Sequence, residues 1–126
     1  MSQIGKKTWL IPDMYWPEQT AEGSHYVSHE AICVLNTADE DCEIEITYYF
    51  EDRNPIQIAP ITCKAKRTNH IRMDKINPKN GLAKGTPYAT VIKSSIPVVV
   101  QYTRVDCTQE ANSIMTTMAY SIDEER

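Results

Sequence analysis

The feature that most limits what this chain can fold into is a hydrophobic pattern with a period of two residues. In "CEIEITYYF" (42–50), Ile44, Ile46, Tyr48 and Phe50 occupy alternate positions. This alternation predicts a β-strand with one buried side and one side in water. Similar runs recur along the sequence, and no segment carries a convincing helical period of useful length. The pattern therefore predicts an all-β protein.

The strand-like runs are separated by short polar or proline-containing links. The polar segment "TADED" between two such runs predicts an antiparallel hairpin over residues 26–51. Pro60 indicates an edge strand or a bulge, because proline cannot donate to a sheet ladder. The expected strands cover residues 7–11, 26–36, 42–50, 56–66, 67–73, 88–95, 97–105 and 113–121. This count, roughly eight, is typical of an antiparallel sandwich or a barrel.

Three links have expected local structures. A tight turn at Ser94–Ser95 precedes Pro97, residues 74–87 form a loop, and residues 108–112 form one helical turn that Thr108 caps. No internal repeat, low-complexity tract or interdomain linker is evident. The 126 residues suit one domain with one core, so we expect a single domain over residues 1–126.

Composition narrows the class of protein. Hydrophobic residues make up 41% and charged residues 24%, which argues against disorder. The formal net charge of −4 argues against broad, sequence-independent nucleic-acid binding, because that requires a basic surface. No apolar run approaches the roughly 20 residues of a membrane span, and the opening segment is too short for a signal-peptide core. We expect a soluble, cytoplasmic protein.

The four cysteines fit a reducing compartment. Cys33, Cys42, Cys63 and Cys107 show no C-x-x-C spacing, so the sequence indicates neither a zinc site nor a thioredoxin-type motif. All four lie in or beside strand-like runs, where a thiol behaves as a small apolar residue. We expect free structural thiols, with a bridge inside the "CVLNTADEDC" hairpin as the alternative.

Catalytic and metal-binding signatures are weak. His25 and His29 would lie on one face of a strand but about 13 Å apart, too far to share an ion unless the chain bends between them. The sequence has no G-x-S-x-G elbow, no evident Cys/His pair and no glycine-rich phosphate loop. We therefore expect no metal, no cofactor and no enzymatic activity.

One polar cluster lies in "KAKRTNHIR" (64–72), which concentrates Lys64, Lys66, Arg67, His70 and Arg72. Two interpretations stand. The cluster is either the solvated face of a strand or a small cationic patch for an acidic partner, a phosphate or a DNA backbone.

The second polar cluster follows the valines of "SSIPVVVQYTRVD" (94–106). Gln101 and Thr103 are expected on one face of this strand, and Tyr102 and Arg104 on the other. These groups line a subunit interface or a ligand groove, or they mark where the strand leaves the core. An unpaired buried arginine is costly, so we expect Arg104 to pair with a carboxylate. The candidates are Glu30, Asp52 and Asp106.

Several strings occur together in collinear order: "SHEAICVLNTADEDCEIEITYYFEDRNPI", "KRTNHIRMDKI", "YATVIKSSIPVVVQYTRVD" and "MTTMAYS". In this combination, from about Trp9 to Tyr120, the sequence resembles the sensory rhodopsin transducer family. The resemblance implies a β-sandwich of jelly-roll type that assembles into a four-fold homotetramer. It also implies a non-enzymatic role in which a cytoplasmic protein relays the state of a membrane photoreceptor.

Two classes of function follow. The first is a signalling or interaction protein of this family. The alternative is a module that binds a small polar ligand such as a carbohydrate, with Trp9, Trp16 or Tyr102 as a stacking surface, or a weak DNA-binding regulator. The candidate ligand- or partner-binding residues are His29, Glu30, Arg67, His70, Arg72, Gln101, Tyr102, Thr103 and Arg104.

Overall fold

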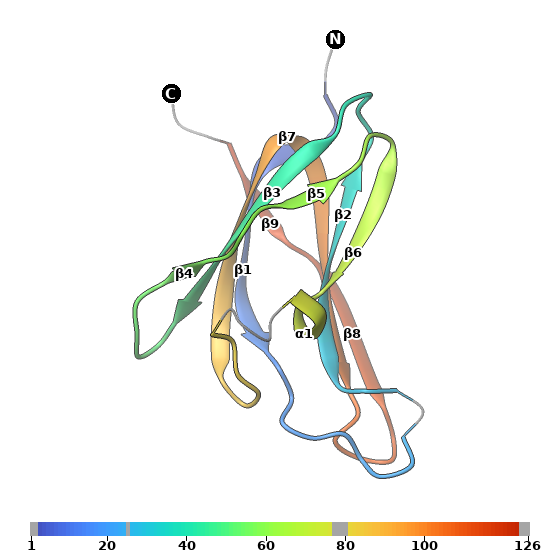
Figure 1. Ribbon diagram of the computed structural model, residues 1–126. Coiled ribbons are helices and arrows are strands. Elements are labelled where there is room, and N and C mark those ends of the chain that lie inside the picture. Colours follow the sequence, from blue (N-terminus) through green and yellow to red (C-terminus); the bar gives the residue numbers. More distant parts are fainter. Residues whose placement is uncertain (1–2, 25, 77–80, 124–126) are drawn as a thin grey trace.

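The computed structural model describes residues 3–24, 26–76 and 81–123. This part of the chain contains nine strands and one short helix (Figure 1). In chain order they are β1 (Lys6–Tyr15), β2 (His29–Asn36), β3 (Cys42–Phe50), β4 (Ile56–Gln57), β5 (Ile61–Cys63), β6 (Arg67–Arg72), α1 (Met73–Ile76), β7 (Pro87–Asp106), β8 (Ser113–Met118) and β9 (Tyr120–Ile122).

The strands form two antiparallel layers, here called sheet A and sheet B. Sheet A contains β1, β3, β4, β5, β9 and the first half of β7. Sheet B contains β2, β6, β8 and the second half of β7. Figure 1 shows β1, β3 and β4 on the left and β2, β6 and β8 on the right. The expected all-β, antiparallel sandwich is confirmed.

Strand β7 joins the two layers, and the tight turn expected at Ser94–Ser95 is wrong. The chain stays extended over 20 residues and changes partners along its length. Ser94 is the last residue in register with β3, and Val99 is the first in register with β2. Pro97 lies between these two ladders, where its missing amide costs the ladders with β2 and β3 no hydrogen bond.

The core lies between the layers and follows the predicted alternation. Ile44, Ile46 and Tyr48 of β3 are fully buried, and Ile32 and Val34 of β2 face them from sheet B. Each such side chain contributes about 1.5–3 kcal/mol by leaving water. Strand β3 is thus the half-buried strand that its sequence predicts.

Gly5 permits a close approach of two backbone segments. It has a φ of +100°, and a Cβ atom at this position would lie 2.0 Å from the carbonyl oxygen of Val98. The same carbonyl accepts a hydrogen bond from Trp9 Nε1 at 3.1 Å. Only glycine fits both the φ angle and the space here.

Other links differ from the expectations. No helical turn follows Thr108; its amide and hydroxyl instead donate to Asp106 Oδ1, at 3.0 and 2.7 Å. The run 56–66 is divided into β4 and β5, both of which pair with β3, so the edge position expected around Pro60 is confirmed. The strand expected over residues 113–121 is divided at Ala119 into β8 and β9. The Ala119 amide donates to Val100 O at 3.2 Å.

The four cysteines are free, as expected, and no bridge closes the hairpin. Cys42, Cys63 and Cys107 are buried, while Cys33 is half-buried. Burial raises the pKa of the Cys33 and Cys63 thiols. No helix in the described residues has the length and apolar character that crossing a membrane requires.

Candidate functional site

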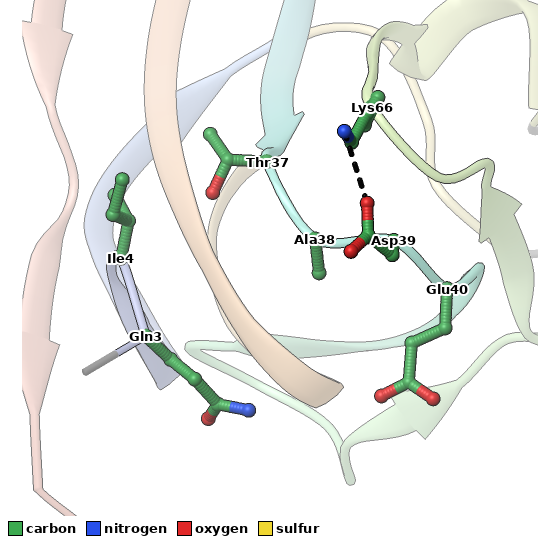
Figure 2. A pocket seen from close by; sticks show the side chains of 7 residues that line it. All are labelled: Gln3, Ile4, Thr37, Ala38, Asp39, Glu40 and Lys66. Carbon is green, nitrogen blue, oxygen red and sulfur yellow. Dashed lines mark ion pairs between the residues drawn. The ribbon is translucent and has the colours of Figure 1, made fainter. Parts of the chain in front are cut away.

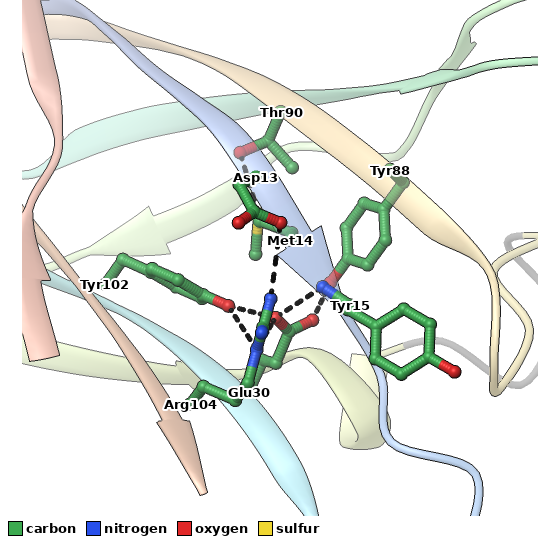
Figure 3. Close-up of polar contacts among 8 residues, drawn as sticks. All are labelled: Asp13, Met14, Tyr15, Glu30, Tyr88, Thr90, Tyr102 and Arg104. Atoms are coloured by element: carbon green, nitrogen blue, oxygen red, sulfur yellow. Dashed lines mark hydrogen bonds and ion pairs between the residues drawn. The ribbon is translucent and has the colours of Figure 1, made fainter. Parts of the chain in front are cut away.

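A carboxylate is buried between the two layers at one end of the sandwich. Glu30 lies on β2, and its side chain has no exposed surface. Figure 3 shows side chains of β7 and a backbone amide of β1 converging on it. Since an ionised carboxylate is costly to bury, its partners decide what this group can do.

Both oxygens of Glu30 accept hydrogen bonds. Tyr88 donates its hydroxyl to Oε1 at 2.6 Å, and the backbone amide of Tyr15 donates to Oε2 at 2.7 Å. The Tyr102 hydroxyl also donates to Oε2. Arg104 Nε lies 3.3 Å from the same oxygen. We call Glu30, Tyr88, Tyr102 and Arg104, with the Tyr15 amide, the Glu30 cluster.

Arg104 connects this cluster to the surface. Its Nε also donates to the Tyr102 hydroxyl at 3.0 Å, and its side chain is 22% exposed. One terminal nitrogen lies 3.6 Å from Asp13 Oδ1, beyond hydrogen-bonding distance, and that carboxylate is 90% exposed. The outer ion pair is therefore weak, and the inner contact with Glu30 holds the guanidinium.

The cluster shifts the pKa values of its members. Burial, together with the charge and hydrogen bond of Glu30, raises the pKa of Tyr88 and Tyr102 far above the ordinary tyrosine value. Burial by itself would lower the pKa of Arg104, but Tyr102 and Glu30 outweigh it and raise that pKa. Both hydroxyls thus stay protonated donors at neutral pH.

The expectation that Arg104 pairs with a carboxylate is confirmed, and the carboxylate is Glu30. The other two candidates have different partners: Asp52 contacts Arg53 at 3.1 Å, and Asp106 accepts from Thr108. These bonds from Thr108 lower the pKa of Asp106.

The candidate residues divide between the two faces of sheet B. Tyr102 and Arg104 point inward to Glu30, as Figure 3 shows, and Gln101 and Thr103 occupy the alternate positions. The expected division of this strand is therefore confirmed.

The outer face of sheet B carries His70, Arg72, Gln101 and Thr103 in cross-strand rows. One row runs His70, Cys33, Gln101 and Met118, and the next runs Arg72, Ala31, Thr103 and Thr116. A shallow hollow of about 480 Å³ lies over the first row, lined by Cys33, Leu35, Val99, Gln101, Thr116, Thr117 and Met118. Arg72 is the arginine of these two rows, and the other groups in them are polar or apolar.

The cationic cluster at 64–72 is partly neutralised. Arg72 makes two 2.8 Å hydrogen bonds to Asp74, whose pKa this contact lowers against the opposing effect of burial. Lys66 pairs with Asp39 at 3.0 Å. Arg67 donates to the carbonyl of Lys66 at 3.0 Å. These contacts favour the solvated strand face over a phosphate-binding patch.

His29 and Glu30 do not converge. Glu30 points inward, whereas His29 Nδ1 lies 2.6 Å from the carbonyl of Val27. His25 lies outside the described residues.

Two of the three aromatic residues expected to stack on a sugar do not form a surface. Trp9 and Tyr102 are buried in the core, and Trp16 is half-buried with Lys84 Nζ 5.5 Å from its ring centre. Trp9 donates its indole N–H to Lys6 O and Val98 O, which makes it a structural residue.

Another hollow, of about 510 Å³, lies beside the β2–β3 turn (Figure 2). It is lined by Gln3, Ile4, Thr37, Ala38, Asp39, Glu40 and Lys66. The Lys66–Asp39 ion pair spans its rim, and both side chains are mostly exposed. The polar groups do not converge on one point in Figure 2, so this hollow offers no built binding site.

Sequence reasoning missed three members of this environment. Tyr88, Asp13 and the Tyr15 amide come from β1 and the first half of β7, distant in sequence from Glu30. The inward position of Tyr88 follows from strand alternation, but its contact with Glu30 depends on how the two layers stack.

The fold and the site together define a class of protein: an antiparallel β-sandwich with a buried carboxylate that groups of its own chain enclose. The sequence matches the family described as Anabaena sensory rhodopsin transducer over residues 4–121. The chain therefore belongs to this family. A comparison with curated proteins finds no match.

Two solved structures are similar to this chain. The crystal structure of Thermotoga maritima 1070 has 33% sequence identity and a TM-score of 0.85, and the match covers 98% of this chain and 100% of that one. The Anabaena sensory rhodopsin transducer has 38% identity and a TM-score of 0.72, with 83% of this chain and 92% of that one covered.

Proposed function

We propose that this protein is a non-enzymatic, cytoplasmic relay that binds a membrane photoreceptor of the microbial sensory rhodopsin type and acts as a homotetramer. The observation that carries the proposal is the family match over residues 4–121. The Anabaena sensory rhodopsin transducer, 38% identical, is named for this role.

The Glu30 cluster supports a role without catalysis. A general acid or base must reach a substrate, and a candidate active site needs a group that is open to it. Glu30 instead gives both oxygens to donors of its own chain and has no exposed surface. Glu30 is therefore a structural residue that links the two layers.

The receptor contact is assigned to the outer face of sheet B, around His70 and Gln101. These side chains flank Cys33 in one cross-strand row, and Gln101 lines the hollow on this face. Arg72, beside them, is already paired with Asp74. The surface thus offers hydrogen bonds and apolar contact without a strong charge, which suits a protein partner more than a nucleic acid.

The alternatives have less support. The saccharide interpretation keeps only the half-buried Trp16 as a stacking residue, because Trp9 and Tyr102 are buried. The DNA-binding interpretation requires cationic side chains that are free to contact phosphates. Lys66 and Arg72 already have carboxylate partners.

Equilibrium binding to a detergent-solubilised microbial sensory rhodopsin tests the proposal. We expect saturable binding by the parent, and Gln101→Ala should raise Kd at least about tenfold, which corresponds to the loss of roughly 1.4 kcal/mol. Gln57→Ala, which removes the same amide from the exposed end of β4, is the matched control and should bind as the parent does. Absence of binding by the folded parent would contradict the proposal.

A further inference from the structure

We propose that β8 of one copy packs into an apolar groove on the outer face of sheet A of the next copy, so that copies associate head to tail. This inference deepens the homo-oligomer of the proposed function, and rests on it, by naming the two surfaces that meet.

Strand β8 is the unprotected edge of this fold. All six of its residues are exposed, and within the described part of the chain it pairs with β7 alone. Ile114, Met115 and Met118 are 63%, 46% and 57% exposed. The sequence "SIMTTM" has neither a charge nor a proline, the usual devices that prevent an edge strand from associating.

Other outlying strands of the fold have such protection. β4, β5 and β9 contain only two or three residues each. β6 carries Arg67, His70 and Arg72. This contrast indicates that the uncharged surface of β8 contacts another molecule.

The outer face of sheet A holds a groove of about 370 Å³ with almost no polar surface. Its floor includes Leu10 and Val91, which are adjacent in the β1–β7 register. Tyr49 and Tyr120, 44% and 67% exposed, stand on β3 and β9 on either side of these strands. Exposed tyrosines around an apolar floor are typical of the central part of a protein interface.

The two surfaces complement each other. One is an exposed, uncharged strand with aliphatic side chains, and the other is an uncharged concave surface with aromatic walls. They lie on different layers of the sandwich, with the groove facing away from sheet B, so β8 cannot fill the groove of its own molecule. Neighbouring copies supply both missing partners: one places its β8 in the groove, and another offers its groove to β8.

Such a contact is heterologous, because two different surfaces of the same chain meet. Repetition of a heterologous contact by a rotation that closes produces a ring. Each copy then buries its own β8, here called the ridge, and its own groove on sheet A. No copy is left with an exposed apolar surface of this kind.

Two lysine substitutions at well-exposed positions test the contact from both sides. Ile114→Lys places a charge on the ridge and Tyr120→Lys places one on the groove; Gln57→Lys, on the exposed end of β4, is the matched charge control. Light scattering and sedimentation give the association state, and thermal melts confirm that each variant is folded.

We expect the parent and Gln57→Lys to associate, while each ridge or groove variant alone becomes monomeric, with Kd raised at least tenfold. An equimolar mixture of Ile114→Lys and Tyr120→Lys should form a 1:1 heterodimer, because an intact groove meets an intact ridge. A monomeric parent, a variant that associates as the parent does, or a mixture that stays monomeric would overturn the inference.

The rhodopsin titration separates this inference from the proposed function. Association that passes the mixing test without any rhodopsin binding would remove the function and leave the contact. Rhodopsin binding by a monomeric parent would overturn the contact and the homotetramer and leave the receptor binding.

Discussion

Arg104 lies directly across from Glu30 in the β2–β7 register, and its Nε is 3.3 Å from Glu30 Oε2. The two residues join adjacent strands of sheet B. Because Tyr88 and the Tyr15 amide bind the same carboxylate from sheet A, the pair also ties the two layers together. Its loss should therefore affect the whole domain.

Replacing Arg104 should destabilise the protein. Arg104→Ala leaves the buried Glu30 carboxylate without its counter-charge, at a cost of about 3 kcal/mol in the free energy of unfolding. Arg104→Lys should cost less, about 1–2 kcal/mol, because an ammonium retains the charge but not the planar geometry of the guanidinium. Urea melts measure both. The exposed Arg67→Ala is the control and should be within about 0.5 kcal/mol of the parent. Melts of both Arg104 variants that overlay the parent's would contradict a structural role.

The tyrosine hydroxyls that donate to Glu30 should each contribute to stability. Tyr88→Phe removes a hydrogen bond to the buried Glu30 carboxylate, which costs about 1.5–3 kcal/mol. Tyr102→Phe should cost at least as much, because it also removes the bond that the hydroxyl accepts from Arg104. Tyr49→Phe removes an exposed hydroxyl and should change little. Chemical denaturation of the three variants provides the comparison. Equal stability for all three would mean that Glu30 is satisfied by other donors.

Stability should fall at alkaline pH. The folded-state pKa values of Tyr88 and Tyr102 are raised above the ordinary value near 10, and burial raises that of Tyr48 to about 12. Above pH 10 the unfolded chain loses these protons while the folded chain keeps them. Stability is therefore fully present below pH 10 and declines above it, by about 1.4 kcal/mol per pH unit for each tyrosine.

Urea melts between pH 8 and about 11.5 test this dependence. In Tyr48→Phe, the free energy of unfolding should fall less steeply above pH 10, because one tyrosine fewer contributes to the decline. The variant and the parent have the same thiols and lysines, so the titration of those groups cancels in the comparison. A slope that is unchanged in this variant would show that the buried Tyr48 does not resist ionisation.

Gly5 should tolerate no side chain. Gly5→Ala places a Cβ 2.0 Å from the Val98 carbonyl at a φ of +100°, and both problems involve backbone that cannot rotate away. We expect a loss of at least about 2 kcal/mol. Gly23→Ala is the matched control, because its φ is also positive but no atom lies within 4 Å of the added carbon. Similar melting temperatures for the two variants would contradict the close approach.

The strands could be predicted from sequence because their signal is local. The alternation in 42–50 identifies the buried face of β3 without reference to any other strand. The path of β7 could not be predicted in the same way. Two serines before Pro97 look like a tight turn, and only the exchange of β3 for β2 as partner shows that one unbroken strand passes from sheet A to sheet B.

The candidate site was predictable in part for a similar reason. The cost of burying a charge predicts that Arg104 pairs with a carboxylate, but it does not distinguish among Glu30, Asp52 and Asp106. The choice of Glu30 depends on the register between β2 and β7, and the contribution of Tyr88 depends on the stacking of the layers. Neither is encoded in residue spacing along the chain.

The photocycle of a microbial sensory rhodopsin, recorded by flash photolysis as this protein is titrated in, tests the central claim most directly. A relay protein that binds the receptor should change the decay rate of a photocycle intermediate, saturably with its concentration, and Gln101→Ala should shift the midpoint upward while Gln57→Ala leaves it in place. A photocycle that is unchanged at every concentration of the folded parent would contradict the account.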